Sequence, residues 1–93
     1  REAEAEATYE AACTEIPDDQ EPRLRLAELH EAAGRIDRAM ESYEQAIRLV
    51  STDPLPYLMR ACLLHRLGRD QEAENDRMTA QGLRRQRGAV EQR

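Results

Sequence analysis

A chain of 93 residues is long enough for one compact domain at most. Phe and Trp are absent and Ala, Glu, Arg and Leu are abundant, which favours an all-helical fold over strands. The net charge of −5 argues against a nucleic-acid partner, because an acidic chain repels phosphate groups. The charge is unevenly spread, however: residues 1–53 carry −8 and residues 54–93 carry +3.

The two cysteines, Cys13 and Cys62, are too few for a disulfide framework and form no metal-type doublet. Both occupy apolar helical positions, where a buried free thiol is expected, so a reducing compartment is favoured. No apolar run approaches the ~18–20 residues that a membrane span needs, and no secretory segment is recognised. We therefore predict a cytoplasmic protein that is not embedded in a membrane.

The first predicted helix covers residues 1–16 and stops at Pro17. Its apolar positions are Ala5, Tyr9, Ala12, Cys13 and Ile16. The alternating Glu-Ala opening also resembles the remnant of a secretion leader. Because Ala5 fits the repeat described below, we interpret this segment as a native helix.

A second and a third helix are predicted between Pro22 and Val50, separated by Gly34, which can adopt the left-handed conformation that ends a helix. The apolar residues of the third helix recur at spacings of three and four and share one stripe. They are Ile36, Ala39, Met40, Tyr43, Ala46, Ile47 and Val50.

The fourth helix is predicted to start at Asp53-Pro54, where Asp can accept hydrogen bonds from free N–H groups and Pro needs no donor. It runs through an apolar segment, Leu55 to Leu67, and ends at Gly68. The fifth helix is the most polar, with Ala73, Ala80 and Leu83 as sparse apolar contacts. Three arginines near its end, Arg84, Arg85 and Arg87, are expected to be solvated, because the helix dipole favours cations there.

Shifting the sequence by 34 residues aligns the same residue types. The aligned columns are Ala5, Ala39 and Ala73; Ala12, Ala46 and Ala80; Tyr9 and Tyr43; Ala27 and Ala61; and Gly34 and Gly68. This pattern resembles the tetratricopeptide repeat, which has small residues between its two helices, Gly at the turn, an aromatic residue in the second helix and Pro after it. Pro17 matches that last position.

The resemblance implies an all-α fold of five helices, arranged as antiparallel helix pairs stacked in a right-handed α-solenoid. The expected segments are a truncated repeat with its loop at 1–19, full repeats at 20–53 and 54–87, and a tail at 88–93. The last repeat departs from the family pattern, because Arg77 and Arg85 replace the usual aromatic residue and Pro. We therefore expect the array to end near residue 87 and the N-terminal end to be cut within a repeat.

No catalytic constellation is recognised, and we predict neither enzymatic activity nor a cofactor. Only two Ser residues occur, Ser42 and Ser51, and the glycines form no phosphate-binding loop. One alternative is a zinc site formed by Cys62 and His65 with two carboxylates that the 34-residue alignment places beside them, but solvated side chains are the favoured interpretation. His30 is interpreted as a packed or hydrogen-bonded core residue.

The resemblance places the first helix of each repeat along a concave groove, and we predict that this groove binds a peptide or helix of a partner protein. The expected groove residues are Leu24, Glu28, Glu31, Leu55, Leu58, Met59, Cys62 and His65. An apolar strip flanked by acidic residues fits an apolar ligand with some positive charge. The alternatives are a purely structural or self-associating segment, and a regulatory domain of a larger enzyme or transcription regulator.

Overall fold

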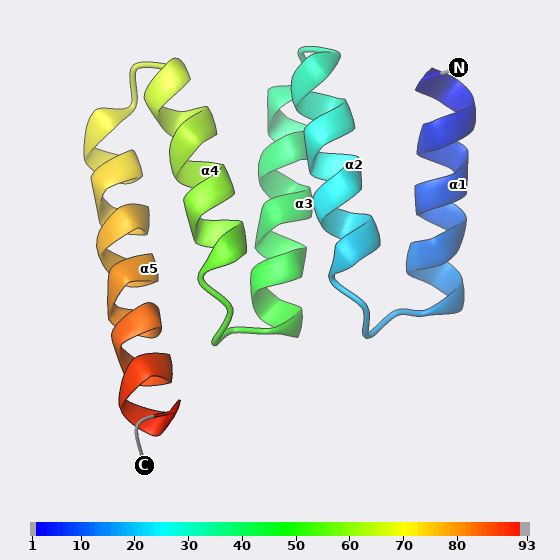
Figure 1. The fold of residues 1–93 in the computed structure, drawn as a ribbon. Coiled ribbons are helices and arrows are strands. Elements are labelled where there is room, and N and C mark those ends of the chain that lie inside the picture. The colour runs from blue at the N-terminus through cyan, green and yellow to red at the C-terminus, as the bar shows by residue number, and fades with distance from the viewer. Residues whose placement is uncertain (1, 92–93) are drawn as a thin grey trace. The chain divides into compact units, whose positions relative to one another are not determined.

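The computed structural model describes residues 2–91, and within this range the chain forms five α-helices and no strand (Figure 1). The helices are α1 (Glu2–Glu15), α2 (Glu21–Ala32), α3 (Ile36–Leu49), α4 (Leu55–Arg66) and α5 (Asp70–Glu91). The predicted all-α repeat fold is therefore confirmed. None of these helices combines the length and the apolar character needed to cross a bilayer.

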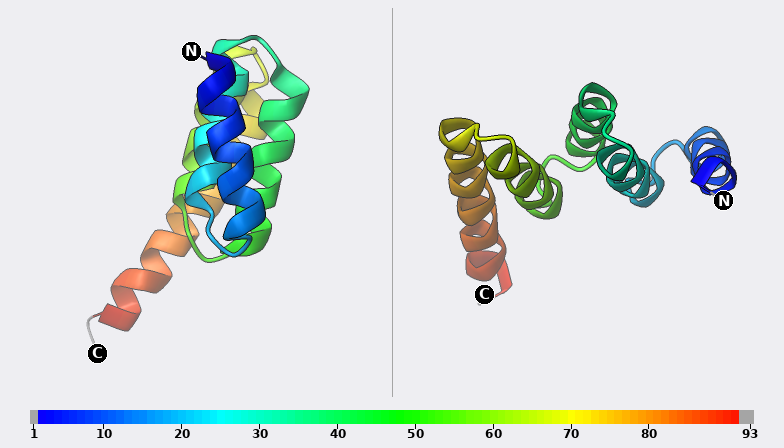
Figure 2. Two further views of the ribbon diagram at one scale, coloured as in Figure 1. Left: turned by 90° about the vertical axis from the view of Figure 1, so that its right-hand side faces the viewer. Right: turned by 90° about the horizontal axis from the view of Figure 1, so that it is seen from above.

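The helices fall into two compact units. Unit 1 (Arg1–Ser51) contains α1, α2 and α3, and α2 packs against both of its neighbours. Figure 2 shows this order within unit 1, with α2 between α1 and α3. Unit 2 (Thr52–Arg93) contains α4 packed against α5. Each unit thus contains an antiparallel helix pair joined by a glycine, α2 with α3 and α4 with α5, and we refer to these two pairs as hairpins.

Both hairpins begin with the same local device, an aspartate before a proline-containing first turn. The backbone N–H of Leu55 donates to Asp53 Oδ1 (3.0 Å), as the sequence predicted for the fourth helix. The backbone N–H of Glu21 donates in the same way to Asp19 Oδ1 (3.0 Å). Each carboxylate satisfies a donor that the helix itself leaves free. The 34-residue repeat therefore extends to the helix starts.

Both hairpins also turn in the same way, at a glycine with a φ of +77°. The N–H of Gly34 donates to the Glu31 carbonyl (3.0 Å) and the N–H of Arg35 to the His30 carbonyl (2.8 Å). In the other hairpin, Gly68 and Arg69 make the two equivalent bonds, at 3.0 and 2.9 Å. This double closure is the Schellman motif, which needs a left-handed residue. The predicted role of both glycines is confirmed.

Small residues let the helices of each hairpin approach closely. The fully buried alanines are those that the 34-residue alignment singled out: Ala27, Ala39, Ala46, Ala61, Ala73 and Ala80. Tyr43 is also buried, whereas Ala5, Tyr9 and Ala12 of α1 are half-buried and Pro17 is exposed. A Cβ is the largest group that fits between two helix backbones in close contact, so these positions set the spacing of the helices.

The last helix departs from the expected segment boundaries. α5 continues through Glu91, so residues 88–91 belong to this helix and not to a tail. Residues 92 and 93 lie outside the described part of the chain. In unit 2, α5 is 22 residues long and α4 only 12, and α5 runs on past the start of α4 (Figure 1). Gly88 does not adopt the positive φ with which Gly34 and Gly68 end their helices, and the arginine-rich segment before it is compatible with helix.

Candidate functional site

The groove residues expected on α2 mostly interact with other side chains of unit 1. Leu24 is only 1% exposed, so it belongs to the core and the expectation that it faces a ligand is wrong. Glu28 is exposed and pairs with Arg25 (2.5 Å). Glu31 is half-buried and accepts a hydrogen bond from the phenol of Tyr43 on α3. Of this set, Glu28 is the most accessible to a partner.

The groove residues expected on α4 form one surface, which we call the α4 face: Leu55, Leu58, Met59, Cys62 and His65. Leu55 is 44% exposed, Leu58 and Met59 are half-buried, and Cys62 and His65 are exposed. Because spacings of three and four keep residues on one side of a helix, these side chains make a continuous stripe. The exposed thiol of Cys62 contradicts the expectation of a buried cysteine.

The remaining apolar residues of α4 have a different environment. Ala61, Leu63 and Leu64 are buried, and α4 packs against α5. The α4 face is therefore an additional apolar surface, separate from the residues that form the core. It lies in unit 2, whereas Glu28 and Glu31 lie in unit 1, so a groove joining the two sets stays a prediction.

The zinc alternative finds no support among residues 3–88, whose side chains the structure describes. No group of three or more His, Cys, Asp and Glu side chains in this range could hold a metal ion. The His65 ring nitrogen Nδ1 instead lies 3.0 Å from Asp70 Oδ1 of α5. His65 is thus occupied by a neighbour in its own unit.

The interpretation of His30 as a hydrogen-bonded core residue is confirmed. Its ring is 8% exposed, and Nδ1 accepts a hydrogen bond from Arg35 Nε (3.0 Å). Arg35 also forms an ion pair with Glu6 of α1. Burial and, to a lesser extent, the guanidinium of Arg35 lower the pKa of His30 below its usual value. His30 is therefore neutral at neutral pH, with the ring proton on Nε2.

Two features were missed by the sequence analysis. The first is a bidentate ion pair across unit 2, in which Arg60 Nε and Nη2 donate to Asp76 Oδ2 and Oδ1 at 2.7 and 2.8 Å. The 34-residue alignment held a signal for it, because Arg60 and Asp76 occupy the positions of Leu26 and Ser42, two core residues of unit 1.

The second missed feature is a cleft of about 270 Å³ within unit 1, between α1, α2 and α3. We call it the α1–α3 cleft. Its polar lining includes Glu6, Glu10, His30, Arg38, Glu41 and Ser42. These residues come from three helices, and no single-helix pattern in the sequence could have assembled them.

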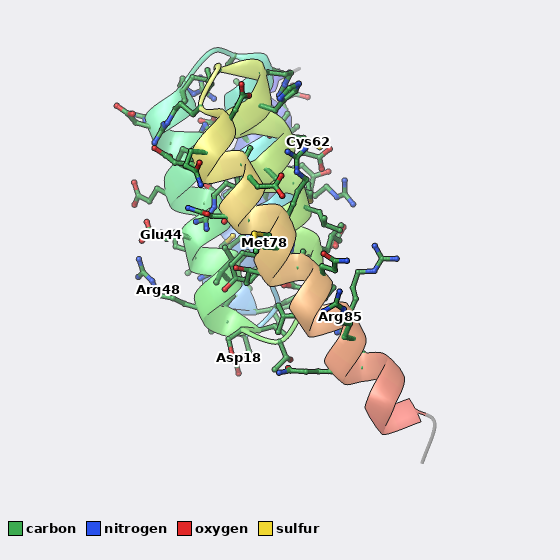
Figure 3. The ribbon with its side chains drawn as sticks, turned by 90° about the vertical axis from the view of Figure 1, so that its left-hand side faces the viewer. Asp18, Glu44, Arg48, Cys62, Met78 and Arg85 are labelled. Carbon is green, nitrogen blue, oxygen red and sulfur yellow. The ribbon has the colours of Figure 1, made fainter. Side chains whose placement is uncertain are left out.

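The exposed side chains of α5 complete the description of the surface. Met78 is 61% exposed, and Figure 3 shows it on the outer side of α5. Arg84, Arg85 and Arg87 are exposed, as the solvated interpretation expects. Within the described chain, no ion pair joins these three arginines to a carboxylate.

The hairpin geometry and the small-residue contacts define a helical-repeat protein. Residues 1–61 match the sequence profile of the tetratricopeptide repeat. The chain belongs to the tetratricopeptide-repeat family. No match was found among curated protein sequences.

A solved structure supports the same assignment. The chain is similar to the type III secretion translocator chaperone SycD of Yersinia enterocolitica, whose crystal structure is described as an alternative dimer. The two share 28% sequence identity and superpose with a TM-score of 0.80 over 88% of this chain and 62% of SycD. The chain thus spans less than two thirds of the length of SycD. Family and neighbour together point to a scaffold for protein–protein interaction.

Proposed function

We propose that this protein binds a peptide or helix of a partner protein on the α4 face, and that this ligand carries some positive charge, which the acidic residues 1–53 attract. The observation that carries the proposal is the surplus of apolar side chains on α4. Leu55, Leu58 and Met59 retain exposure, whereas Leu63 and Leu64 are buried. An exposed apolar stripe on a helix is typical of interaction surfaces.

The chemistry of the stripe suits a helix or extended segment with apolar anchors. Met59 offers a flexible, polarizable contact that adapts to different side chains. The charge of −8 over residues 1–53 attracts basic segments and speeds their encounter with the surface. The likeness to a translocator chaperone is consistent with a polypeptide ligand.

A peptide array probed with the wild type and with Met59→Ala tests this proposal. We expect Met59→Ala to weaken binding to the captured apolar-basic peptides by ~1–2 kcal/mol, as for an interface anchor. Met78→Ala is the matched control, since Met78 is exposed on α5 and lies outside the α4 face. Glu28→Arg should shift preference away from basic peptides.

The purely structural alternative makes the opposite prediction. If α4 serves only to pack against a neighbouring repeat, Leu58→Ala lowers the melting temperature and the set of captured peptides stays the same. Equal binding by the wild type, Met59→Ala and Glu28→Arg would remove the α4 face as a binding site.

Self-association is a second candidate, favoured by the apolar side of α1 and the residue that follows it. Ile16 is 56% exposed, and Tyr9 and Cys13, spaced to share its side of the helix, are half-buried. SycD has been crystallised as a dimer. If copies of this chain pair through α1, Ile16→Asp should abolish concentration-dependent association in sedimentation velocity. An unchanged sedimentation profile would exclude this surface.

A further inference from the structure

The α1–α3 cleft in unit 1 has an excess of negative charge. Three carboxylates line it, Glu6, Glu10 and Glu41, against the single guanidinium of Arg38. Glu6 is committed to Arg35. Among the described residues no ion pair engages Glu10, Glu41 or Arg38, and Glu41 accepts only a long bond from Gln45 (3.5 Å). Two carboxylates are therefore available to a cation that enters the cleft.

The cleft also has buried polar groups in its lining. Ser42 is only 7% exposed, and its hydroxyl makes no hydrogen bond to another described residue. This hydroxyl can therefore donate to or accept from a ligand that enters the cleft. His30, equally buried, is kept neutral by its surroundings and adds no competing positive charge at neutral pH.

Unit 2 shows what the equivalent position accommodates. The 34-residue alignment equates Leu26 with Arg60 and Ser42 with Asp76. In unit 2 a guanidinium lies there against a buried carboxylate, with two hydrogen bonds. In unit 1 the residue in the place of that arginine is the shorter Leu26, which lines the cleft beside Ser42. The hairpin geometry of this repeat thus accepts a guanidinium at this position.

We propose that the α1–α3 cleft receives an arginine side chain of a partner polypeptide, whose guanidinium pairs with Glu10 and Glu41 and donates one hydrogen bond to Ser42 Oγ. The planar guanidinium has five donors and suits several acceptors at once. Arg38 offers donors for a backbone carbonyl of the same segment, which favours a polypeptide over a free cation. The cleft belongs to unit 1 and the α4 face to unit 2, and the proposal does not depend on the function proposed for the α4 face.

The test is an NMR titration of the full ¹⁵N-labelled chain with a short Gly-Ser peptide that carries one central arginine. The comparison peptide carries citrulline, which keeps the shape of arginine but has no charge. We expect the arginine peptide to shift resonances of residues that line the cleft and to bind at least ~5-fold more tightly than the citrulline peptide. Equal affinity for the two peptides, or shifts confined to other regions, would overturn the proposal.

Matched variants locate the site. Glu10→Gln and Glu41→Gln should each weaken binding of the arginine peptide by up to ~5-fold. Glu44→Gln is the control, because Glu44 lies on α3 but does not line the cleft. Its carboxylate pairs with Arg48 (3.6 Å), and Figure 3 shows the two side chains near each other. Met59→Ala should leave this binding unchanged, so failure here is distinguishable from failure of the α4 face. Wild-type affinity in both cleft variants would refute the assignment.

Discussion

In the hairpin of unit 1, the buried ring of Tyr43 fills the space between α2 and α3, and its hydroxyl donates to Glu31. In the hairpin of unit 2, the equivalent position is Arg77, which is exposed and pairs with Glu74. Polar links between α4 and α5 come instead from the ion pair of Arg60 and Asp76 and from the contact of His65 with Asp70. The two hairpins share caps, turns and buried alanines, but different side chains join their helices.

The comparison separates what the repeat fixes from what it leaves free. Backbone closure depends on residues that are costly to replace, such as glycine at positive φ and alanine between helices. The side-chain contact that joins the two helices can be made by an aromatic ring or by a buried ion pair. A buried ion pair stabilises little relative to an apolar pair, because desolvation offsets the attraction, but losing one partner is costly. Unit 2 is therefore the more sensitive hairpin.

The largest effect is expected from Asp76→Ala. Asp76 is only 6% exposed, and removing its carboxylate leaves the largely buried Arg60 guanidinium without this partner. We expect a loss of about 3 kcal/mol in the free energy of unfolding, measured by urea denaturation. The double variant Arg60→Leu/Asp76→Ser, which copies unit 1, should recover most of this loss. If the double variant is as unstable as Asp76→Ala, the two hairpins are not interchangeable at this position.

The next effect concerns the alanines that both hairpins share. Ala39 and Ala73 are fully buried at equivalent positions. Replacing either with Leu forces the helices apart and should lower stability by ~1–3 kcal/mol in thermal or urea unfolding. Ala3→Leu is the control on an exposed site of α1 and should have little effect. Similar losses at Ala3 and Ala39 would contradict the repeat register.

The turn glycines should respond alike in the two hairpins. A Cβ at Gly34 or Gly68 meets nothing within 4 Å, so only the φ of +77° opposes a side chain. We expect Gly34→Ala and Gly68→Ala each to cost about 1 kcal/mol. Gly82→Ala, within α5 and equally unobstructed, should instead stabilise by ~0.5–1 kcal/mol. A cost at only one of the two turns, measured by the same denaturation assay, would show that turns of equal geometry contribute differently to the free energy of unfolding.

The smallest effect is a pH dependence confined to unit 1. The folded pKa of His30 lies below the ordinary 6.5, because of burial first and then the charges of Arg35 and Arg38, while Glu6 and Glu10 partly oppose the shift. Between these two pKa values the unfolded chain binds more protons, so stability is full above pH 6.5 and falls as the pH drops below it.

Urea denaturation at several pH values would measure this dependence. His30→Leu, which copies Leu64 of unit 2, should make the free energy of unfolding less dependent on pH. His65→Gln should leave the contribution of His30 to this dependence unchanged. A profile that stays equally steep in His30→Leu would assign the pH dependence to other groups.

The sequence predicted the elements whose cause is local. Gly34 and Gly68 end their helices because of their own conformational freedom, and Asp53 accepts a hydrogen bond from the N–H of Leu55, only two residues away, so both could be inferred without the fold. Burial of Leu24 and exposure of Cys62 depend on how neighbouring helices cover each face, which a helical period does not determine. The α1–α3 cleft is lined by residues of three helices, so no single segment of the sequence predicts it. The extension of α5 depends on residues 88–91 remaining helical, which a local pattern does not determine.

The Gly34 and Gly68 turns also have a consequence for folding kinetics. Each turn joins two helices that pack on each other, so the contacts of a hairpin bridge only short separations along the chain. Loop-closure entropy is small for such contacts, and low contact order correlates with rapid folding. Since each hairpin has its own turn and its own buried alanines, either can nucleate first. Stopped-flow experiments would then detect two folding phases, and the faster phase would belong to the hairpin whose helices pair more quickly.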